Sequence, residues 1–208
     1  MDKDLVVIKA IIEADYQRHI KRFDASYETS DILFLGDSMM AYAPLKKMNL
    51  NHLINLGIPG DTTIGVLKRL SYVYKAKPKF VFLHIGSNDL VLTNLSKNEI
   101  IDNIQKIILE LKDNGIIVYL LSITPILSNH QKTNRTYVKN RSNEEINDLN
   151  EELRSLCGIT QYIDVNKALK DDQNQLRENY TTDGVHLNQA GYDIFFQIIQ
   201  QNISFKLI

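Results

Sequence analysis

Five short runs of apolar residues, each set among turn residues and helical patterns, constrain the fold of this chain most. The clearest run is Ile32–Leu35, where four branched or aromatic residues in succession are typical of a strand buried on both faces. Strands that alternate with helices predict a parallel sheet covered by helices on both faces. We therefore expect an α/β fold, a three-layer α/β/α sandwich with a five-stranded parallel sheet. The expected strands span residues 32–35, 52–56, 79–85, 116–123 and 162–165.

Helical patterns occupy the segments between and around these strands. In the N-terminal segment 3–23, apolar residues recur at spacings of three and four, which predicts an amphipathic helix. Ser96 and Glu99 form a capping-box pattern that begins another helix. No internal repeat or second domain is evident, so we expect residues 1–208 to form a single domain. Further helices are expected from Thr62 or Thr63 to about Lys77, from Ser142 to Cys157, and from Asn188 onward.

Composition narrows the class of protein. The chain has 24 basic and 25 acidic residues, a net charge of -1, which is no electrostatic footprint for nucleic acid. No run of 18 apolar residues is present, so we expect no membrane span. The first residues do not resemble a signal peptide, because Lys9 interrupts a short apolar run. A single cysteine, Cys157, excludes an internal disulfide. We expect a soluble, cytoplasmic protein.

Polar residues follow the first three expected strands, each in the turn where its strand ends. Ser38 comes directly after Gly36 and Asp37, Gly60 ends the turn after the second strand, and Asn88 lies in the turn after the third. In an open α/β sheet, ligands bind beyond the carboxyl ends of the strands. Ser38 is therefore a candidate nucleophile. Taken alone, this stretch favours Ser38 as the cap of the next helix.

Another polar pair precedes the last expected helix. Asp183 and His186 are three residues apart, so a single turn can bring the carboxylate against an imidazole nitrogen. A serine hydroxyl becomes a good nucleophile when a base takes its proton, and histidine titrates near neutral pH. An aspartate on the other imidazole nitrogen fixes the tautomer and stabilises the imidazolium. Ser38, Asp183 and His186 would supply these three roles, although Asp183 could instead cap the last helix.

Acyl transfer also needs hydrogen-bond donors that stabilise the oxyanion of a tetrahedral intermediate. Three donors are available in the turns after the first three strands. They are the backbone N–H groups of Ser38 and Gly60 and the side-chain amide of Asn88. Gly60 has no Cβ, so its backbone can approach a substrate closely. The three turns should open on the same edge of the sheet, which would bring these donors together.

Four blocks of the sequence resemble the SGNH branch of the GDSL esterase/lipase family. They are residues 36–38, 55–60, 86–89 and 183–186, which read GDS, NLGIPG, GSND and DGVH. The residue after the first block is methionine, where the family has leucine. The resemblance implies a flavodoxin-like (SGNH hydrolase) fold that hydrolyses esters without a metal or organic cofactor. It implies Ser38, Asp183 and His186 as catalytic residues, and Ser38, Gly60 and Asn88 as oxyanion-hole donors.

We therefore expect a serine esterase that acts on a small-molecule ester. The expected acyl group is short, such as acetyl, on a carbohydrate or a lipid-like alcohol. Three alternatives stay open: a thioesterase or lysophospholipase for longer acyl chains, a non-catalytic binding module of the same fold, and a flavodoxin-like nucleotide or flavin binder. The chain lacks the G-x-S-x-G of α/β-hydrolases and the glycine motifs that bind phosphate or dinucleotides. Its scattered histidines do not have zinc-ligand spacing.

Two features have open roles. Segment 124–141 shows no helical periodicity and no acidic residue, and its basic residues include Lys132 and Arg135. A connection of this length is typical of a functional loop or lid, or of a disordered segment. Its charge could attract an anionic substrate, but a solvated loop is the favoured interpretation. His84, near the end of the third strand, could line a pocket or be buried against a neighbouring group.

Overall fold

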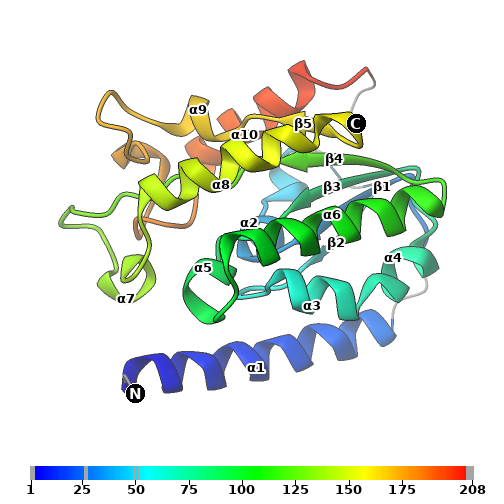
Figure 1. Cartoon of the computed structure of the whole chain (residues 1–208), viewed down its shortest axis with the longest axis horizontal. Helices are drawn as coiled ribbons and strands as arrows, with labels where there is room; N and C mark the ends of the chain where they lie inside the picture. The colour runs from blue at the N-terminus through cyan, green and yellow to red at the C-terminus, as the bar shows by residue number, and fades with distance from the viewer. Residues whose placement is uncertain (1–2, 26–27, 49, 51, 205–208) are drawn as a thin grey trace. The chain divides into compact units, whose positions relative to one another are not determined.

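The structure is a computed structural model of the 208-residue chain. It describes residues 3–25, 28–48, 50 and 52–204. Helices and strands alternate along this part of the chain, as the sequence predicts (Figure 1). Within the same residues, no helix is both long enough and apolar enough to cross a membrane.

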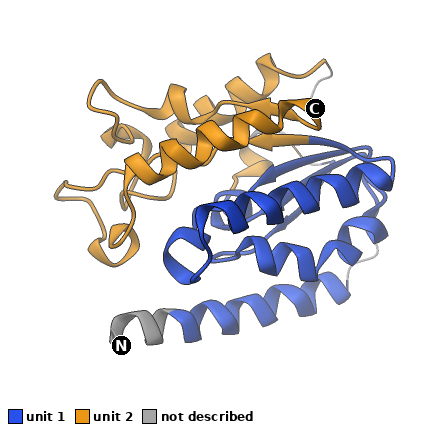
Figure 2. Cartoon of the chain, in the orientation of Figure 1, with its two compact units in different colours: residues 1–42, 52–118 blue, residues 43–51, 119–208 orange. Residues whose placement is uncertain are grey.

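The chain divides into two compact units, each built from two separate stretches of sequence (Figure 2). Unit 1 comprises residues 1–42 and 52–118, and unit 2 comprises residues 43–51 and 119–208. The expectation of a single domain over residues 1–208 stays a prediction. The two ends of that range lie outside the described residues.

Five strands form one parallel sheet in the order β2-β1-β3-β4-β5, which confirms the expected α/β fold. In unit 1, Gly36 at the end of β1 pairs with Gly57 of β2 on one side and with His84 of β3 on the other. The three strands therefore end level with one another, and the turns that follow them leave from the same edge. The strands are β1 (Ile32–Gly36), β2 (Leu53–Gly57), β3 (Phe80–His84), β4 (Ile117–Leu121) and β5 (Gln161–Ile163).

The helices of unit 1 include the one whose start the capping-box pattern predicts. The capping box of Ser96 and Glu99 is present at the start of the longest helix after α1, and the apolar stripe of that helix is buried. The residues from Leu33 to Leu35 and from Val81 to Leu83 are fully buried, which explains their unbroken apolar runs. The helices are α1 (Lys3–Asp24), α2 (Ser38–Ala41), α3 (Thr63–Lys68), α4 (Leu70–Ala76), α5 (Asp89–Leu92) and α6 (Lys97–Asp113).

Helix α1 runs alongside α3 and α4 (Figure 1). At its C-terminal end, the buried Phe23 ring lies 5.7 Å from the ring of Tyr72 in α4, between centroids. The Tyr72 hydroxyl donates a hydrogen bond of 2.7 Å to Asp24. An apolar contact and a hydrogen bond therefore hold the C-terminal end of α1 against α4.

The single helix predicted from Thr62 or Thr63 to about Lys77 is two helices in the structure. Thr62 is the cap, because its side chain accepts a hydrogen bond from the backbone N–H of Gly65. The helix breaks at Arg69, whose φ of -122° and ψ of 17° are not helical. The second helix ends at Lys77, which adopts the left-handed conformation with a φ of 51°.

In unit 2, two helix asparagines fix the segment that follows β4. Asn150 accepts a hydrogen bond from the N–H of Ile123 and donates one to its carbonyl, and Asn143 does the same with Ile126. Each amide thus satisfies the N–H and carbonyl of a buried residue that lies outside the strands. The elements of unit 2 are η1 (Leu45–Met48), α7 (Arg135–Val138), α8 (Asn143–Ser155), η2 (Leu156–Gly158), β5, α9 (Asn166–Leu169), η3 (Glu178–Tyr180) and α10 (Gln189–Gln201).

Candidate active site

Ser38 is the first residue of α2, in the turn that leaves β1. The cap of this helix is Asp37, whose Oδ1 accepts a hydrogen bond of 2.9 Å from the N–H of Met39. The interpretation of Ser38 as a helix cap is therefore wrong. Gly36 has a φ of +152°, and a Cβ there would lie 1.9 Å from the carbonyl oxygen of His84. Only glycine fits at this point, because backbone meets backbone where a side chain would start.

His84 supports the same turn from the neighbouring strand. Its imidazole is fully buried, and Nδ1 lies 3.2 Å from Oδ1 of Asp37. The N–H of Asp37 also donates a hydrogen bond of 3.3 Å to the carbonyl of His84. The interpretation of His84 as a buried histidine paired with a neighbour is confirmed. It helps to hold the turn that presents Ser38.

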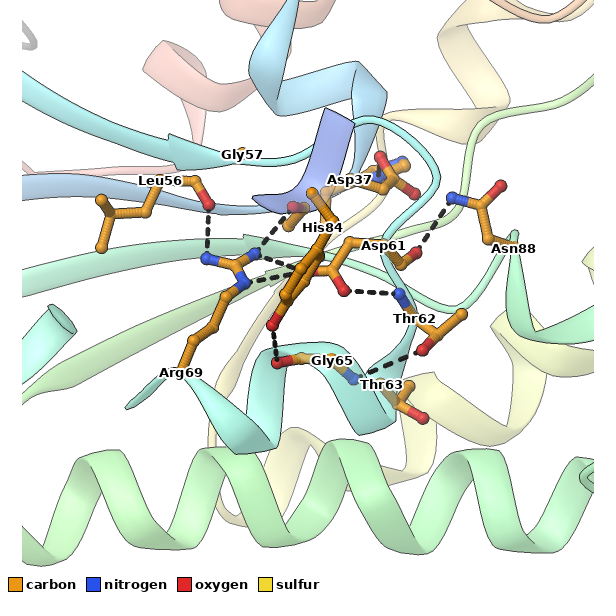
Figure 3. A network of polar contacts seen from close by, with 12 residues as sticks. Asp37, Leu56, Gly57, Asp61, Thr62, Thr63, Gly65, Arg69, His84 and Asn88 are labelled. Carbon is orange, nitrogen blue, oxygen red and sulfur yellow. Dashed lines mark hydrogen bonds and ion pairs between the residues drawn. The ribbon is translucent and has the colours of Figure 1, made fainter. Parts of the chain in front are cut away.

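The turns that carry Gly60 and Asn88 are in direct contact. The side-chain amide of Asn88 donates a hydrogen bond of 2.9 Å to the carbonyl of Asp61 (Figure 3). The N–H of Asp61 donates to the carbonyl of Ile58, which closes the turn around Gly60 at a φ of +77°. The expectation that these turns share one edge of the sheet is confirmed.

A buried ion pair lies behind these turns, and the sequence analysis did not find it. Arg69 is 1% exposed, and its Nε donates a hydrogen bond of 2.7 Å to Asp61 (Figure 3). The other guanidinium nitrogens donate to the carbonyl of Leu56, at 2.6 Å, and to the carbonyl of Gly36, at 3.0 Å. One side chain therefore ties the ends of β1 and β2 to the turn after β2.

The signal for this pair was present in the sequence. Arg69 lies three residues after Val66 and four before Val73, both of which are fully buried. It therefore occupies an apolar stripe, where a charged residue needs a buried partner. Asp61, in the turn just before the helix, is that partner.

Asp89 is a second buried carboxylate at this edge. It accepts hydrogen bonds from the N–H of Thr63, at 3.0 and 3.1 Å, and from the Thr63 hydroxyl, at 2.6 Å. Burial raises the pKa of Asp89 to about 6, although the hydrogen bonds from Thr63 act in the opposite direction. Because Asp89 follows Asn88 directly, this contact fixes the backbone next to the candidate oxyanion amide.

In unit 2, the expected contact between Asp183 and His186 is present. Oδ2 of Asp183 lies 2.7 Å from Nδ1 of His186, and Oδ1 accepts hydrogen bonds from the N–H groups of Val185 and His186. Burial raises the pKa of Asp183, but these hydrogen bonds outweigh it, so the pKa lies below its usual value. The carboxylate is thus ionised at neutral pH. The cap of α10 is Asn188 and not Asp183.

Segment 124–141 folds back onto this pair. The N–H of Asn134 donates a hydrogen bond of 2.8 Å to the carbonyl of Asp183, and the N–H of Leu127 donates to the carbonyl of Gly184. The ring of Tyr137, in α7, packs edge to face with the His186 ring at 5.4 Å between centroids. Tyr137 is 43% exposed. Sequence reasoning missed this aromatic neighbour because the segment has no periodicity to place it.

The predicted site residues form two groups, each held by contacts within its own unit. Ser38, Gly60 and Asn88 belong to unit 1, and Asp183 and His186 belong to unit 2. Among the residues that the structure describes, no three His, Cys, Asp or Glu side chains gather as metal ligands would. This part of the chain therefore offers no candidate metal centre.

Comparison with known protein families decides what class of protein carries this arrangement. A model described as the GDSL-like lipase/acylhydrolase family matches residues 34–194. The chain belongs to this family. The matched region of the GDSL-like acylhydrolase includes the turns of Ser38, Gly60 and Asn88 and the pair of Asp183 and His186, and it begins after α1.

The chain also matches individual proteins. The GDSL-like chain is 31% identical over 172 residues to an N-acylneuraminate cytidylyltransferase of Escherichia coli, covering 79% of this chain and 38% of that protein. It thus spans well under half of the length of this curated relative. It also resembles a solved Streptococcus pneumonia protein provisionally described as a platelet activating factor, with 28% identity, a TM-score of 0.82, and 94% and 95% of the two chains covered.

An acetylxylan esterase from Geobacillus stearothermophilus has the same fold. It is 19% identical to this GDSL-like chain, with a TM-score of 0.67, and the match covers 88% of this chain and 98% of the esterase. At this identity the likeness shows the architecture alone.

Proposed function

We propose that this acylhydrolase is a serine esterase that uses Ser38, His186 and Asp183 as a catalytic triad. The observation that carries the proposal is the contact between Asp183 and Nδ1 of His186, in a member of a family of lipases and acylhydrolases. The lowered pKa of Asp183 keeps its carboxylate charged. A charged carboxylate on Nδ1 stabilises the imidazolium that forms when Nε2 takes a proton.

The proposed reaction has two steps. In the first, Ser38 Oγ attacks the ester carbonyl while His186 Nε2 takes its proton, and the alcohol leaves with that proton. In the second, water attacks the acyl-enzyme carbonyl while His186 Nε2 takes one of its protons, and His186 then gives that proton to Ser38 Oγ as the acid leaves. Both steps pass through a tetrahedral oxyanion.

The proposed oxyanion hole consists of the N–H groups of Ser38 and Gly60 and the amide of Asn88. The Asn88 amide donates a hydrogen bond to the carbonyl of Asp61, which directly follows Gly60, so this contact holds two of the proposed donors near each other. The buried Arg69 and Asp89 support the backbone on either side, which keeps the donors in place without reorganisation during the reaction.

For the substrate, we propose a short acyl ester, such as acetyl, carried by a sugar. One relative supports the sugar, because it is named for an N-acylneuraminate. The exposed ring of Tyr137 beside His186 is a further support, because aromatic faces are good surfaces for apolar sugar faces. A lysophospholipase or thioesterase for longer chains is the competing proposal, and acyl-chain length separates the two.

The test is hydrolysis of p-nitrophenyl acetate, butyrate and octanoate by the wild-type protein and by Ser38→Ala. We expect turnover of the acetate to fall to background in the variant, because no nucleophile remains. A maximum at acetate supports the acetylesterase, and a maximum at octanoate supports the long-chain proposal. Equal turnover by variant and wild type would refute the triad. Absence of turnover in both, with acetylated sugars as well, would favour a binding module.

A further inference from the structure

Helix α1 contacts the back of the turn that carries Gly60, although it precedes the family match. A Cβ on Gly60 would lie 2.7 Å from both Cγ1 and Cγ2 of Ile12 and 2.9 Å from its Cδ1. The Ile12 side chain therefore occupies the place that a side chain on Gly60 would need. Because the family match starts at residue 34, nothing in the family motifs assigns a role to this contact.

A polar contact one turn further along α1 fixes the helix against the same region. The hydroxyl of Tyr16 donates a hydrogen bond of 3.4 Å to the carbonyl of Gly65 in α3. Ile12 and Tyr16 are four residues apart, so they lie on one face of α1. That face is thus set on the turn after β2 and on the helix that follows it.

The direction of the Gly60 N–H depends on the backbone conformation of its turn, so neighbouring residues must restrain that conformation. Gly60 has a φ of +77°. Glycine has more conformational freedom than any other residue, so this conformation is not fixed by the residue itself. The Arg69 guanidinium holds the Asp61 carboxylate and the carbonyl of Leu56. The Ile12 side chain adds a second restraint, because it fills the place where a Cβ of residue 60 would be.

We propose that Ile12 is a positioning residue for the oxyanion hole, which makes α1 part of the catalytic apparatus. The inference rests on the proposed function of Gly60 as an oxyanion donor. Ile12 does not touch the substrate. It restrains the Gly60 backbone so that the N–H points to the oxyanion of the tetrahedral intermediate and not to the ground-state carbonyl.

The test compares Ile12→Ala and Ile12→Val with the matched control Ile11→Ala. Ile11 is the neighbouring isoleucine of the same helix and is 63% exposed, so its truncation should not change activity. Active sites are titrated to completion with a fluorophosphonate, and kcat for p-nitrophenyl acetate is expressed per titrated site. Complete loss of an oxyanion donor costs about 100-fold or more, so a displaced donor in Ile12→Ala should lower kcat about tenfold.

We expect KM to stay unchanged. The kcat per titrated site of Ile12→Val should lie between the values of wild type and Ile12→Ala. The Ki of a trifluoromethyl ketone, which forms a tetrahedral adduct, should rise by the same factor by which kcat/KM falls. A merely structural role would lower the fraction of titratable sites and leave kcat per site as in the wild type. That result would overturn the inference. So would a kcat per site that does not fall in the order wild type, Ile12→Val, Ile12→Ala. If Ser38→Ala is fully active, the proposed function itself fails, which is a separate result.

Discussion

At the scale of single residues, the burial of the Arg69 charge leads to a prediction about stability. Its guanidinium is buried against one carboxylate and two backbone carbonyls. Substitution Arg69→Met leaves the Asp61 charge and both carbonyls without these donors. Removing one partner of a buried ion pair costs about 3–5 kcal/mol, and we expect a loss of this size in the free energy of unfolding. Urea denaturation followed by circular dichroism measures it.

The exposed pair of Arg18 and Asp15 in α1 is the control. These side chains also form an ion pair, at 3.0 Å, but Arg18 is 77% exposed. Because water screens such a pair, Arg18→Met should change the free energy of unfolding by less than about 1 kcal/mol. If Arg69→Met is as mild as Arg18→Met, Arg69 does not tie the strand ends together.

Asp89 should make stability depend on pH in a direction opposite to most carboxylates. Its folded-state pKa is raised to about 6, so the folded protein holds a proton that the unfolded chain releases near its ordinary pKa of 3.8. The stabilisation is therefore fully present below about pH 4 and is lost as the pH rises through about 6. A difference of roughly two pKa units corresponds to about 3 kcal/mol.

The measurement is the difference in unfolding free energy between wild type and Asp89→Asn at several pH values from 4 to 7. We expect wild type to lose stability relative to Asp89→Asn as the pH rises through this range. Asp183 has a lowered pKa, so its stabilisation is present above about 3.8 and is lost as the pH falls further. A difference that is flat with pH would mean that Asp89 is ionised in the folded protein throughout.

At the scale of elements, the short helix α7 contributes a side chain that contacts His186, the candidate base. The Tyr137 ring packs edge to face with the His186 ring, and an aromatic pair of this kind contributes about 1 kcal/mol. We expect Tyr137→Ala to lower kcat for p-nitrophenyl acetate about fivefold, because the imidazole loses a contact that orients it. Tyr137→Phe keeps the ring and should keep most of the activity.

Arg135 in the same helix provides the comparison for this prediction. Its substitution, Arg135→Ala, removes an exposed cation and leaves Tyr137 in place, so turnover of this neutral ester should not change. If Arg135→Ala and Tyr137→Ala have equal effects, α7 acts through its charge or its folding, and the ring contact is not the cause.

The sequence predicted elements where the signal is local. Apolar runs and glycine turns located the five strands, and the capping box located the start of α6. The helix break at Arg69 was not predictable in the same way, because no proline or glycine lies at this position or directly beside it. The burial of Arg69 depends on Asp61 and on two strand-end carbonyls, which come together only when the sheet forms.

Some contacts of the candidate site were likewise predictable from the sequence, and others were not. The contact between Asp183 and His186 was predictable because one turn connects them. The contacts of Ile12 with Gly60 and of Tyr137 with His186 join residues about fifty apart, and neither has a motif. Family resemblance points to residues that react, whereas the residues that hold them in place depend on packing.

At the scale of the whole molecule, the two units are interleaved along the chain. Residues 43–51 belong to unit 2 but lie between two stretches of unit 1, and the boundary at 118–119 falls inside β4. A strand shared in this way cannot unfold for one unit alone. We therefore expect a single cooperative unfolding transition, as in small single domains.

Two spectroscopic probes test this expectation. Far-ultraviolet circular dichroism follows the helices of both units, and near-ultraviolet circular dichroism follows the 10 tyrosines, in a chain without tryptophan. The midpoints in urea should coincide. Two separate transitions would show that the units fold independently and that the single-domain expectation fails.

The close approach of backbones at Gly36 also limits how this protein can change under selection. A Cβ at Gly36 would meet the His84 carbonyl at 1.9 Å, and one at Gly57 would meet the N–H of Ala41 at 2.3 Å. Such positions admit one amino acid, so the end of the sheet cannot be reshaped stepwise. A library of random variants that is selected for folding should therefore retain glycine at both positions.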